Sequence, residues 1–446
     1  MLANQLCTFI NNSPSPFHAV SEASKSLLEA GFVKLQETSP TQWSNLKLGG
    51  KYFFTRNSST LVAFAIGANF SHEKSAFAMV AAHTDSPCLK LKPNFTATEA
   101  NSNANALVKV PVQTYGGGLW HTWFDRDLAI AGRVIVKEHG TSQLSQHLVN
   151  IPGPMLKIPS LAIHLNRAVD SEGFKFNRET HLVPLSGHNE SALLHAIQRQ
   201  LPAESTILDG ELCLYDCQPA TIGGLNAELV FAARLDNLLM TFCGLKGFIE
   251  ATTNSNSCTN QISMLALFDN EEVGSVSAQG ADSTLLSQCI TRILSALSVA
   301  PVHHASILAR SMLISADCAH AVHPNWPEVH EAQHKPALNA GPVLKVNANQ
   351  RYATTSITAA VIKQIASEAQ VNLQEFVVRN DAGCGTTIGP LVAAGLAVRT
   401  VDLGNPQLSM HSIRETAGAA DVESGVRLLG AFYAAFGQAE QSLFIE

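Results

Sequence analysis

Residues 262–272 read "ISMLALFDNEE", in which a continuous apolar run is followed at once by a group of acids. A short apolar run of this length predicts a buried strand in a sheet that is covered on both faces. In open α/β sheets, ligands bind beyond the carboxyl ends of the strands. Glu271 and Glu272 therefore follow the strand at the place where a functional site is expected.

The same arrangement, an apolar strand with a metal-capable side chain after it, recurs along the chain. The other members are His83 and Asp85 in "FAMVAAHTD" (77–85), Asp236 in "LVFAARLDN" (229–237), Asp317 in "SMLISAD" (311–317) and His411 in "AVRTVDLGNPQLSMH" (397–411). Because strand ends of one sheet share an edge, we expect these side chains to converge on one crevice.

So many acids can share a crevice only if cations neutralise them, because like charges raise one another's pKa. Two divalent ions meet this requirement when each has a histidine and a carboxylate and a further carboxylate bridges them. Of the neighbouring glutamates, Glu272 can bind metal while Glu271 takes the proton of the attacking water. Asp85, two residues beyond His83, is placed to bind the other ring nitrogen of that histidine.

The sequence pattern changes along the chain, and 446 residues are more than a single hydrophobic core usually accommodates. Apolar strands alternate with helices in the first and last parts, whereas the middle consists of short strand-like pieces with many turn residues, such as "AGRVIVKEHG" (131–140). We predict an α/β catalytic domain over 1–93 and 233–446, interrupted by a β-rich insert over 94–232.

Composition excludes several classes of protein. Hydrophobic residues make up 46% and charged residues 15%, which argues against disorder, and the net charge of −7 argues against a nucleic-acid partner. The sequence contains neither an 18-residue apolar run nor the pattern of a secretory signal, so we expect no membrane partner. The nine scattered cysteines are expected to be buried thiols, which favours a cytoplasmic location.

Beyond these physical arguments, the chain resembles the aspartyl aminopeptidases, a family of dinuclear zinc exopeptidases. The resemblance runs in order over nearly the whole chain. It is carried by "AAHTDSP" (81–87), "YGGGLWHTWFDRDLAIAGRV" (115–134), "IPSLAIHLNR" (158–167), "ARLDNL" (233–238), "DNEEVGS" (269–275), "SADCAHAVHPN" (315–325), "GPVLKVNANQRYAT" (341–354), "RNDAGCGTTIGP" (379–390) and "SMHSIRE" (409–415).

The resemblance implies a role for each matching residue. Asp236 would bridge two zinc ions whose other ligands are His83, Glu272, Asp317 and His411, one of the ions being exchangeable for another divalent metal. Glu271 would be the general base, and Asp85 would orient His83. The pocket for an acidic substrate side chain would consist of His320, Lys345 and Tyr352.

The resemblance also implies assembly from dimers into a tetrahedral dodecamer. In that assembly His164 would reach the active site of a neighbouring subunit and steady the oxyanion; the alternative that His164 is a metal ligand stays open. The implied activity is removal of the N-terminal residue, preferably Asp or Glu, from peptides.

Two other functions compete with this one: a dinuclear-zinc amidohydrolase acting on N-acyl amino acids or dipeptides, and a non-catalytic scaffold that retains the fold. A third hypothesis comes from "VHEAQHKP" (329–336), which contains the His-Glu-x-x-His signature of another zinc protease class. That signature requires a long helix with an apolar face. Here it lies between Pro327 and Pro336 among polar residues, so we predict that His330 and His334 do not bind metal.

Overall fold

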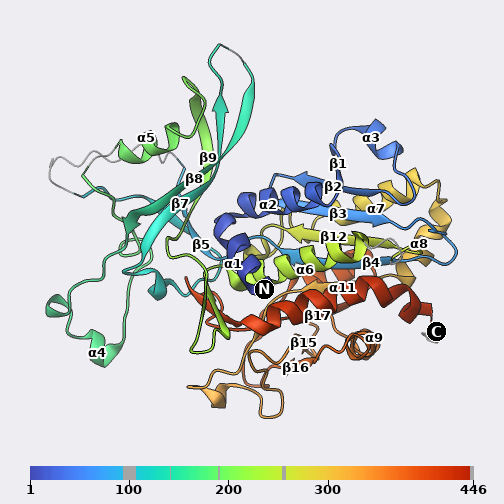
Figure 1. Cartoon of the computed structure of the whole chain (residues 1–446). Helices are drawn as coiled ribbons and strands as arrows, with labels where there is room; N and C mark the ends of the chain where they lie inside the picture. The colour runs from blue at the N-terminus through green and yellow to red at the C-terminus, as the bar shows by residue number, and fades with distance from the viewer. Residues whose placement is uncertain (94–106, 141, 189–190, 254–257, 442–446) are drawn as a thin grey trace.

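The computed structural model describes residues 1–93, 107–140, 142–188, 191–253 and 258–441, in which a β-rich part projects from a larger α/β body (Figure 1). A sheet of nine strands runs through that body. In spatial order its strands are β1 (Val33–Lys34), β2 (Lys51–Arg56), β3 (Thr60–Ile66), β12 (Ile262–Phe268), β4 (Phe77–His83), β13 (Met312–Ala316), β17 (Arg399–Gly404), β15 (Val343–Val346) and β16 (Gln374–Val377).

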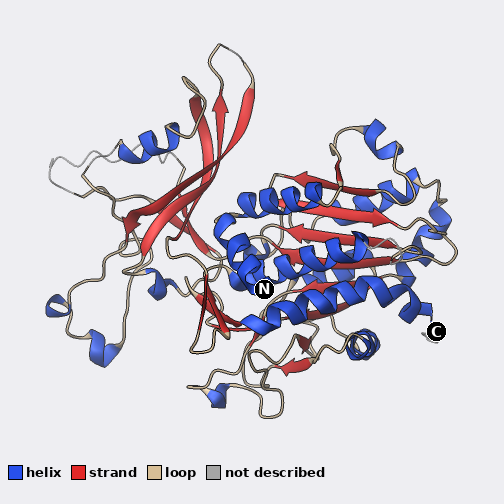
Figure 2. Cartoon of the chain, viewed as in Figure 1, coloured by secondary structure: helices blue, strands red, loops and turns tan. Residues whose placement is uncertain are grey.

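Helices cover both faces of this sheet (Figure 2). One face packs against α1 (Leu2–Asn12), α2 (Pro16–Glu29), α6 (Leu235–Thr253), α9 (Ser356–Glu368) and α11 (Ala419–Gln441). The other packs against α3 (Pro40–Ser44), α7 (Leu285–Ala296), α8 (His304–Arg310) and α10 (Ile388–Leu396). In β4, Ala78 and Val80 belong to the first core and Phe77 and Met79 to the second. Burial on both faces explains why such strands are apolar throughout.

Four neighbouring strands of the sheet, β12, β4, β13 and β17, run parallel to one another. Phe268, the last residue of β12, lies opposite His83, the last residue of β4, and Ala316 at the end of β13 lies opposite Leu403 in β17. Parallel strands in this register end at one edge of the sheet. The acids and histidines that follow them are therefore delivered to the same place, and the predicted α/β fold class is confirmed.

The projecting part is built on a five-stranded sheet. In spatial order its strands are β6 (Val112–Tyr115), β5 (Cys88–Leu91), β9 (Thr206–Asp216), β7 (Asp127–Lys137) and β8 (Leu144–Lys157). The short helices of this part are α4 (Val169–Glu172), α5 (Ala192–Gln198), η1 (Trp120–Trp123) and η2 (Ile163–Leu165). The sheet starts six residues before the predicted insert boundary at 94, because β5 continues directly from the loop that follows β4.

A third sheet of five strands lies beside the edge where the parallel strands end. Its strands are β10 (Thr221–Gly223), β11 (Leu229–Ala232), β19 (Glu415–Gly418), β18 (Pro406–Leu408) and β14 (Ala319–His320). Residues 221–232 thus pair with strands of the α/β part, although they lie within the predicted insert range of 94–232. Turn-rich composition revealed short strands there but could not reveal their partners.

All nine cysteines lie within the described ranges, and they form no disulfide there. Five of them are buried and four are half-buried, so the expectation of burial holds only for the five, which are Cys7, Cys213, Cys243, Cys289 and Cys318. Among the helices of the described ranges, none has the length and apolar character needed to pass through a bilayer.

Candidate metal centre

Six of the side chains singled out by sequence meet beyond the shared edge of the parallel strands. We call them the acid–histidine cluster: His83, Asp236, Glu271, Glu272, Asp317 and His411. His83 ends β4, Asp317 follows β13, and the two glutamates open the short turn η3 (Glu271–Val273) after β12. Asp236 lies at the start of α6, and His411 follows β18. The convergence predicted from strand ends is therefore present.

The cluster divides into two halves that share Asp236. Nε2 of His83 lies 3.4 Å from Oδ1 of Asp236 and 3.6 Å from Oδ1 of Asp317. Nε2 of His411 lies 3.2 Å from the other oxygen of Asp236, Oδ2, and 3.3 Å from Oε2 of Glu272. Each half thus contains one histidine, one carboxylate of its own and one oxygen of Asp236. This is the donor set that two bridged divalent ions require.

Burial and charge make the cluster a suitable cation site. Asp236 Oδ1 and Glu272 Oε1 are buried, and within the described ranges neither atom accepts a hydrogen bond of good geometry. A buried carboxylate oxygen without a donor is costly unless a cation faces it. Neutral histidine nitrogens and carboxylate oxygens are also the ligands that zinc accepts. The residues present therefore fit two zinc ions.

The titration behaviour of the cluster shows how strongly its acids need positive charge. Burial raises the pKa of Glu271 to about 9 and that of Glu272 to about 7. Burial by itself lowers the pKa of His411, but the contacts with Asp236 and Glu272 outweigh this effect and raise the pKa to about 12. Zinc ligands must be deprotonated, so bound cations would take over the compensation that protons otherwise provide.

The two neighbouring glutamates differ in their surroundings. The side chain of Glu272 is 3% exposed, whereas that of Glu271 is 14% exposed, and its Oε2 lies 3.9 Å from Nε2 of His83. Geometry alone also groups Glu271 with His83 and Asp317 as a set that could hold a metal. Glu271 is therefore the more exposed of the two glutamates, and its contact with a histidine is the longer one.

Asp85 contacts both His83 and the turn that carries the glutamates. The Nδ1 atom of His83 lies 3.0 Å from the main-chain oxygen of Asp85 and 3.4 Å from its carboxylate Oδ1. The carboxylate oxygens accept the backbone N–H groups of Glu271 and Glu272, each at 3.1 Å. Asp85 therefore lies where it can orient His83, and it also anchors η3.

Two residues of the site were missed from sequence. Glu415 is buried, accepts the backbone N–H of Asp236 at 3.0 Å and that of His411 at 2.8 Å, and so fixes the main chain of two cluster members. Burial raises the pKa of Glu415 to about 8. Tyr115 donates its hydroxyl to Asp85 Oδ2 at 2.6 Å. Glu415 comes four residues after His411, which could have drawn attention to it; Tyr115 has no comparable signal.

The three residues predicted to form the acidic-side-chain pocket lie close together. The ring of Phe376 lies 5.8 Å from the ring of His320 and 6.4 Å from that of Tyr352, centre to centre. Nζ of Lys345 lies 5.1 Å from the centre of the Tyr352 ring and 3.3 Å from Oδ2 of Asp317. His320 and Phe376 also line a cavity of about 290 Å³. This group therefore adjoins the cluster on the side of Asp317.

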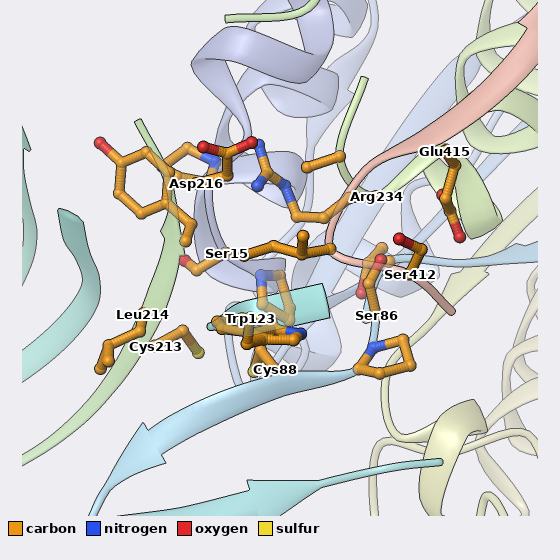
Figure 3. A pocket seen from close by; sticks show the side chains of 17 residues that line it. Ser15, Ser86, Cys88, Trp123, Cys213, Leu214, Asp216, Arg234, Ser412 and Glu415 are labelled. Carbon is orange, nitrogen blue, oxygen red and sulfur yellow. The ribbon is translucent and has the colours of Figure 1, made fainter. Parts of the chain in front are cut away.

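Behind the cluster lies a much smaller cavity, of about 30 Å³, at the junction with the projecting sheet (Figure 3). Ser86, Arg234 and Glu415 are among its lining residues, and Ser86 donates to the main-chain oxygen of Asp236 at 2.6 Å. A space of this size holds about one water molecule. This cavity is therefore too small for a substrate.

His164 and the "HEAQH" motif lie outside the cluster. His164 is exposed in η2 of the projecting part, and the metal-capable groups formed by the described residues do not include it. His330 and His334 follow the one-turn helix η5 (Pro327–Val329) in irregular chain, and each is held by a local contact: His330 accepts the N–H of His323, and His334 contacts Glu331. Without a helix the motif lacks the geometry of a zinc site.

Comparison with known proteins gives concordant matches over the whole chain. The family model of the aminopeptidase I zinc metalloproteases (M18) matches residues 9–433. A probable aspartyl aminopeptidase of Ricinus communis is 44% identical, over 99% of this chain and 97% of the relative. In the cryo-EM structure of the Ape4 and Nbr1 complex, the matching chain is 40% identical with a TM-score of 0.93, over 100% of this chain and 87% of that one. The Saccharomyces cerevisiae mApe1 dodecamer is 30% identical with a TM-score of 0.86, over 98% of each chain.

Proposed function

Because the chain belongs to the aminopeptidase I zinc metalloprotease family (M18), we propose that it removes the N-terminal residue of peptides, preferably Asp or Glu, at a pair of zinc ions. It is a zinc-dependent peptidase. The observation that carries the two-ion proposal is the orientation of Asp236, which turns one oxygen toward His83 and the other toward His411.

The residues that would hold the ions follow from the two halves of the cluster. His83 and Asp317 would bind one ion, His411 and Glu272 would bind the other, and Asp236 would bridge them. When bound, two such ions lower the pKa of a water between them and polarise the carbonyl group of the scissile bond. The substrate's free α-amino group would be held at the same place, which restricts cleavage to the end of a peptide.

Glu271 is the general base in this proposal. It is more exposed than Glu272, and η3 places it beside His83, so its carboxylate can reach a water at the cluster. Glu271 accepts a proton from that water as its oxygen attacks the carbonyl carbon. It then passes the proton to the nitrogen of the departing peptide, which would otherwise leave as a poor amide anion.

The preference for acidic residues rests on Lys345, which is 2% exposed. An ammonium group has three hydrogens to donate. Two of them have acceptors, since Lys345 donates to Asp317 Oδ2 at 3.3 Å and to the main-chain oxygen of Cys318 at 3.1 Å. The third can bind the side-chain carboxylate of a substrate. His320 and Tyr352 would form the remaining walls of this pocket.

We also propose that the protein works as a homo-oligomer, and the dodecamer formed by the similar yeast protein is the expected form. The chain carries support for an additional contact around His164. Leu161, Ile163 and Leu165 are 60%, 46% and 75% exposed, and an apolar group of this kind commonly marks a protein interface. We propose that a second copy of the chain covers these residues and that His164 then reaches the active site of that second copy.

The proposed specificity is tested by replacing Lys345 with methionine, which keeps the chain length and removes the charge. For a peptide that begins with Asp, kcat/KM is expected to fall about 10- to 100-fold more than for the same peptide beginning with Leu, because a buried charged hydrogen bond is lost. Released amino acid is measured for both peptides and for an N-acetylated Asp peptide. An equal loss of kcat/KM for the two free peptides would mean that Lys345 only holds Asp317 and does not select acidic residues. Cleavage of the acetylated peptide by the wild type would favour the amidohydrolase alternative.

A further inference from the structure

A short segment of the projecting part contacts His411 of the cluster and Asp85, the aspartate that itself contacts His83. We call residues 115–119, "YGGGL", the glycine strap. The main-chain oxygen of Gly117 lies 3.1 Å from Nδ1 of His411, and the N–H of Leu119 donates to the main-chain oxygen of His411 at 2.8 Å. Tyr115 donates to Asp85, the neighbour of His83. The strap thus reaches both halves of the cluster from outside.

Asp85 is 0% exposed, and among the described residues Tyr115 is one of the three donors whose hydrogen bonds its carboxylate accepts. Asp85 Oδ1 accepts the N–H of Glu271, and Oδ2 accepts both the N–H of Glu272 and the hydroxyl of Tyr115. Of these donors, only the hydroxyl comes from outside η3. It therefore connects the turn that carries the two glutamates with the projecting part of the chain.

Contacts other than the one with Asp85 also hold the side chain of Tyr115 in place. Tyr115 lies opposite Cys88 in the pairing of β6 with β5, and the ammonium group of Lys90 lies 3.9 Å from the centre of its ring. The side-chain amide of Asn270, the residue before η3, donates to its hydroxyl at 3.0 Å. These contacts direct the hydroxyl at Asp85.

The glycine that follows Tyr115 allows this close approach. Gly116 has a φ of +77°, in the region that favours glycine, and a Cβ atom at this position would lie 3.2 Å from Cβ of Glu272. A side chain at position 116 would therefore crowd Glu272 in addition to straining the backbone. The strap can touch the turn only because this position carries no side chain.

We propose that Tyr115 is a positioning residue for the metal pair. By fixing the Asp85 carboxylate, its hydroxyl sets the orientation of His83 and the position of η3, and hence of Glu271 and Glu272. This inference rests on the proposed zinc site and adds a residue of the projecting part to it. The carboxylate or carbonyl partner of a metal-binding histidine typically contributes 10- to 100-fold in metal affinity or activity, and Tyr115 would act through such a partner, Asp85.

The test uses the full-length Tyr115→Phe variant, which removes one oxygen atom, and compares it with Tyr215→Phe. Tyr215 lies in the same sheet and donates its hydroxyl to Asn150, away from the cluster. Zinc affinity is measured by competition with a chelator, and kcat and KM with an Asp peptide. Tyr115→Phe is expected to lower zinc affinity about 10- to 100-fold and to lower kcat with little change in KM, whereas Tyr215→Phe keeps the wild-type values.

A double-mutant cycle with Asp85→Asn separates positioning from packing. If Tyr115 acts through Asp85, adding Tyr115→Phe to Asp85→Asn changes zinc affinity by less than about twofold; independent effects would multiply. The visible absorption of the cobalt-substituted protein, which reports ligand geometry, should shift in Tyr115→Phe and not in Tyr215→Phe. Wild-type zinc affinity and an unchanged cobalt spectrum in Tyr115→Phe would overturn the inference while leaving the zinc site standing. A wild-type protein that bound no zinc would instead overturn the proposed function.

Discussion

Replacing Glu271 with glutamine is expected to lower kcat by about 10²- to 10⁴-fold while zinc content stays at the wild-type level. Glutamine has nearly the shape of glutamate and keeps the backbone N–H that Asp85 accepts, so η3 should be retained. It cannot accept the proton of the attacking water, and the loss should therefore fall on the chemical step. The measurement is kcat with an Asp peptide, together with metal analysis of the purified variant.

The matched control for this variant is Glu331→Gln. Glu331 is the glutamate of the "HEAQH" motif, and it would be the base if that motif were the active site. Within the described ranges its carboxylate accepts hydrogen bonds from Gln333 and His334, and although it borders the cavity that His320 lines, it has no contact with the acid–histidine cluster. Glu331→Gln should keep normal kcat and zinc content. Normal turnover in Glu271→Gln would remove that residue from the mechanism, and a large loss in Glu331→Gln would favour the motif as the active site.

Replacing Asp236 with asparagine is expected to have an effect at least as large. The amide keeps the shape but loses the negative charge and one of the two oxygens, which face His83 and His411 separately. Two neighbouring cations can then no longer share an anionic bridge. Zinc content should fall from two ions per chain to one or none, and kcat should fall about 10³-fold or more, because metal catalysis supplies several kcal/mol.

Asp421→Asn serves as the control for the second variant. Asp421 is also a buried aspartate, but its carboxylate accepts the backbone N–H groups of Asn339 and Gly341 and has no contact with the cluster. This variant should lose some stability and keep two zinc ions. If Asp236→Asn retained both ions and normal turnover, Asp236 would not be the bridge.

The part of the site that could be predicted from sequence is the part set by strand ends. His83, Glu271, Glu272 and Asp317 each follow an apolar strand, and parallel strands in register deliver their ends to one edge. The chemistry of the donors then indicated metal. Because this reasoning uses only local patterns and one rule of α/β topology, it needs no knowledge of the contacts between distant segments.

What could not be predicted depends on contacts between segments that are distant in sequence. Spacing alone does not reveal that Asp317 belongs with His83 and Glu272 with His411. It also does not reveal that β10 and β11 pair toward β19, which moves residues 221–232 out of the sheet of the projecting part. Tyr115 was hidden for the same reason, since 30 residues separate it from Asp85. The metal, base and pocket roles carried over by resemblance remain predictions.

The most direct test is the crystal structure of the zinc-loaded protein, with anomalous data collected at the zinc absorption edge. Two peaks are expected in each chain, about 3.5–4 Å apart on either side of the Asp236 carboxylate. One should lie against His83 and Asp317, and the other against His411 and Glu272. A single peak, or a peak beside His330 and His334, would contradict the two-ion centre.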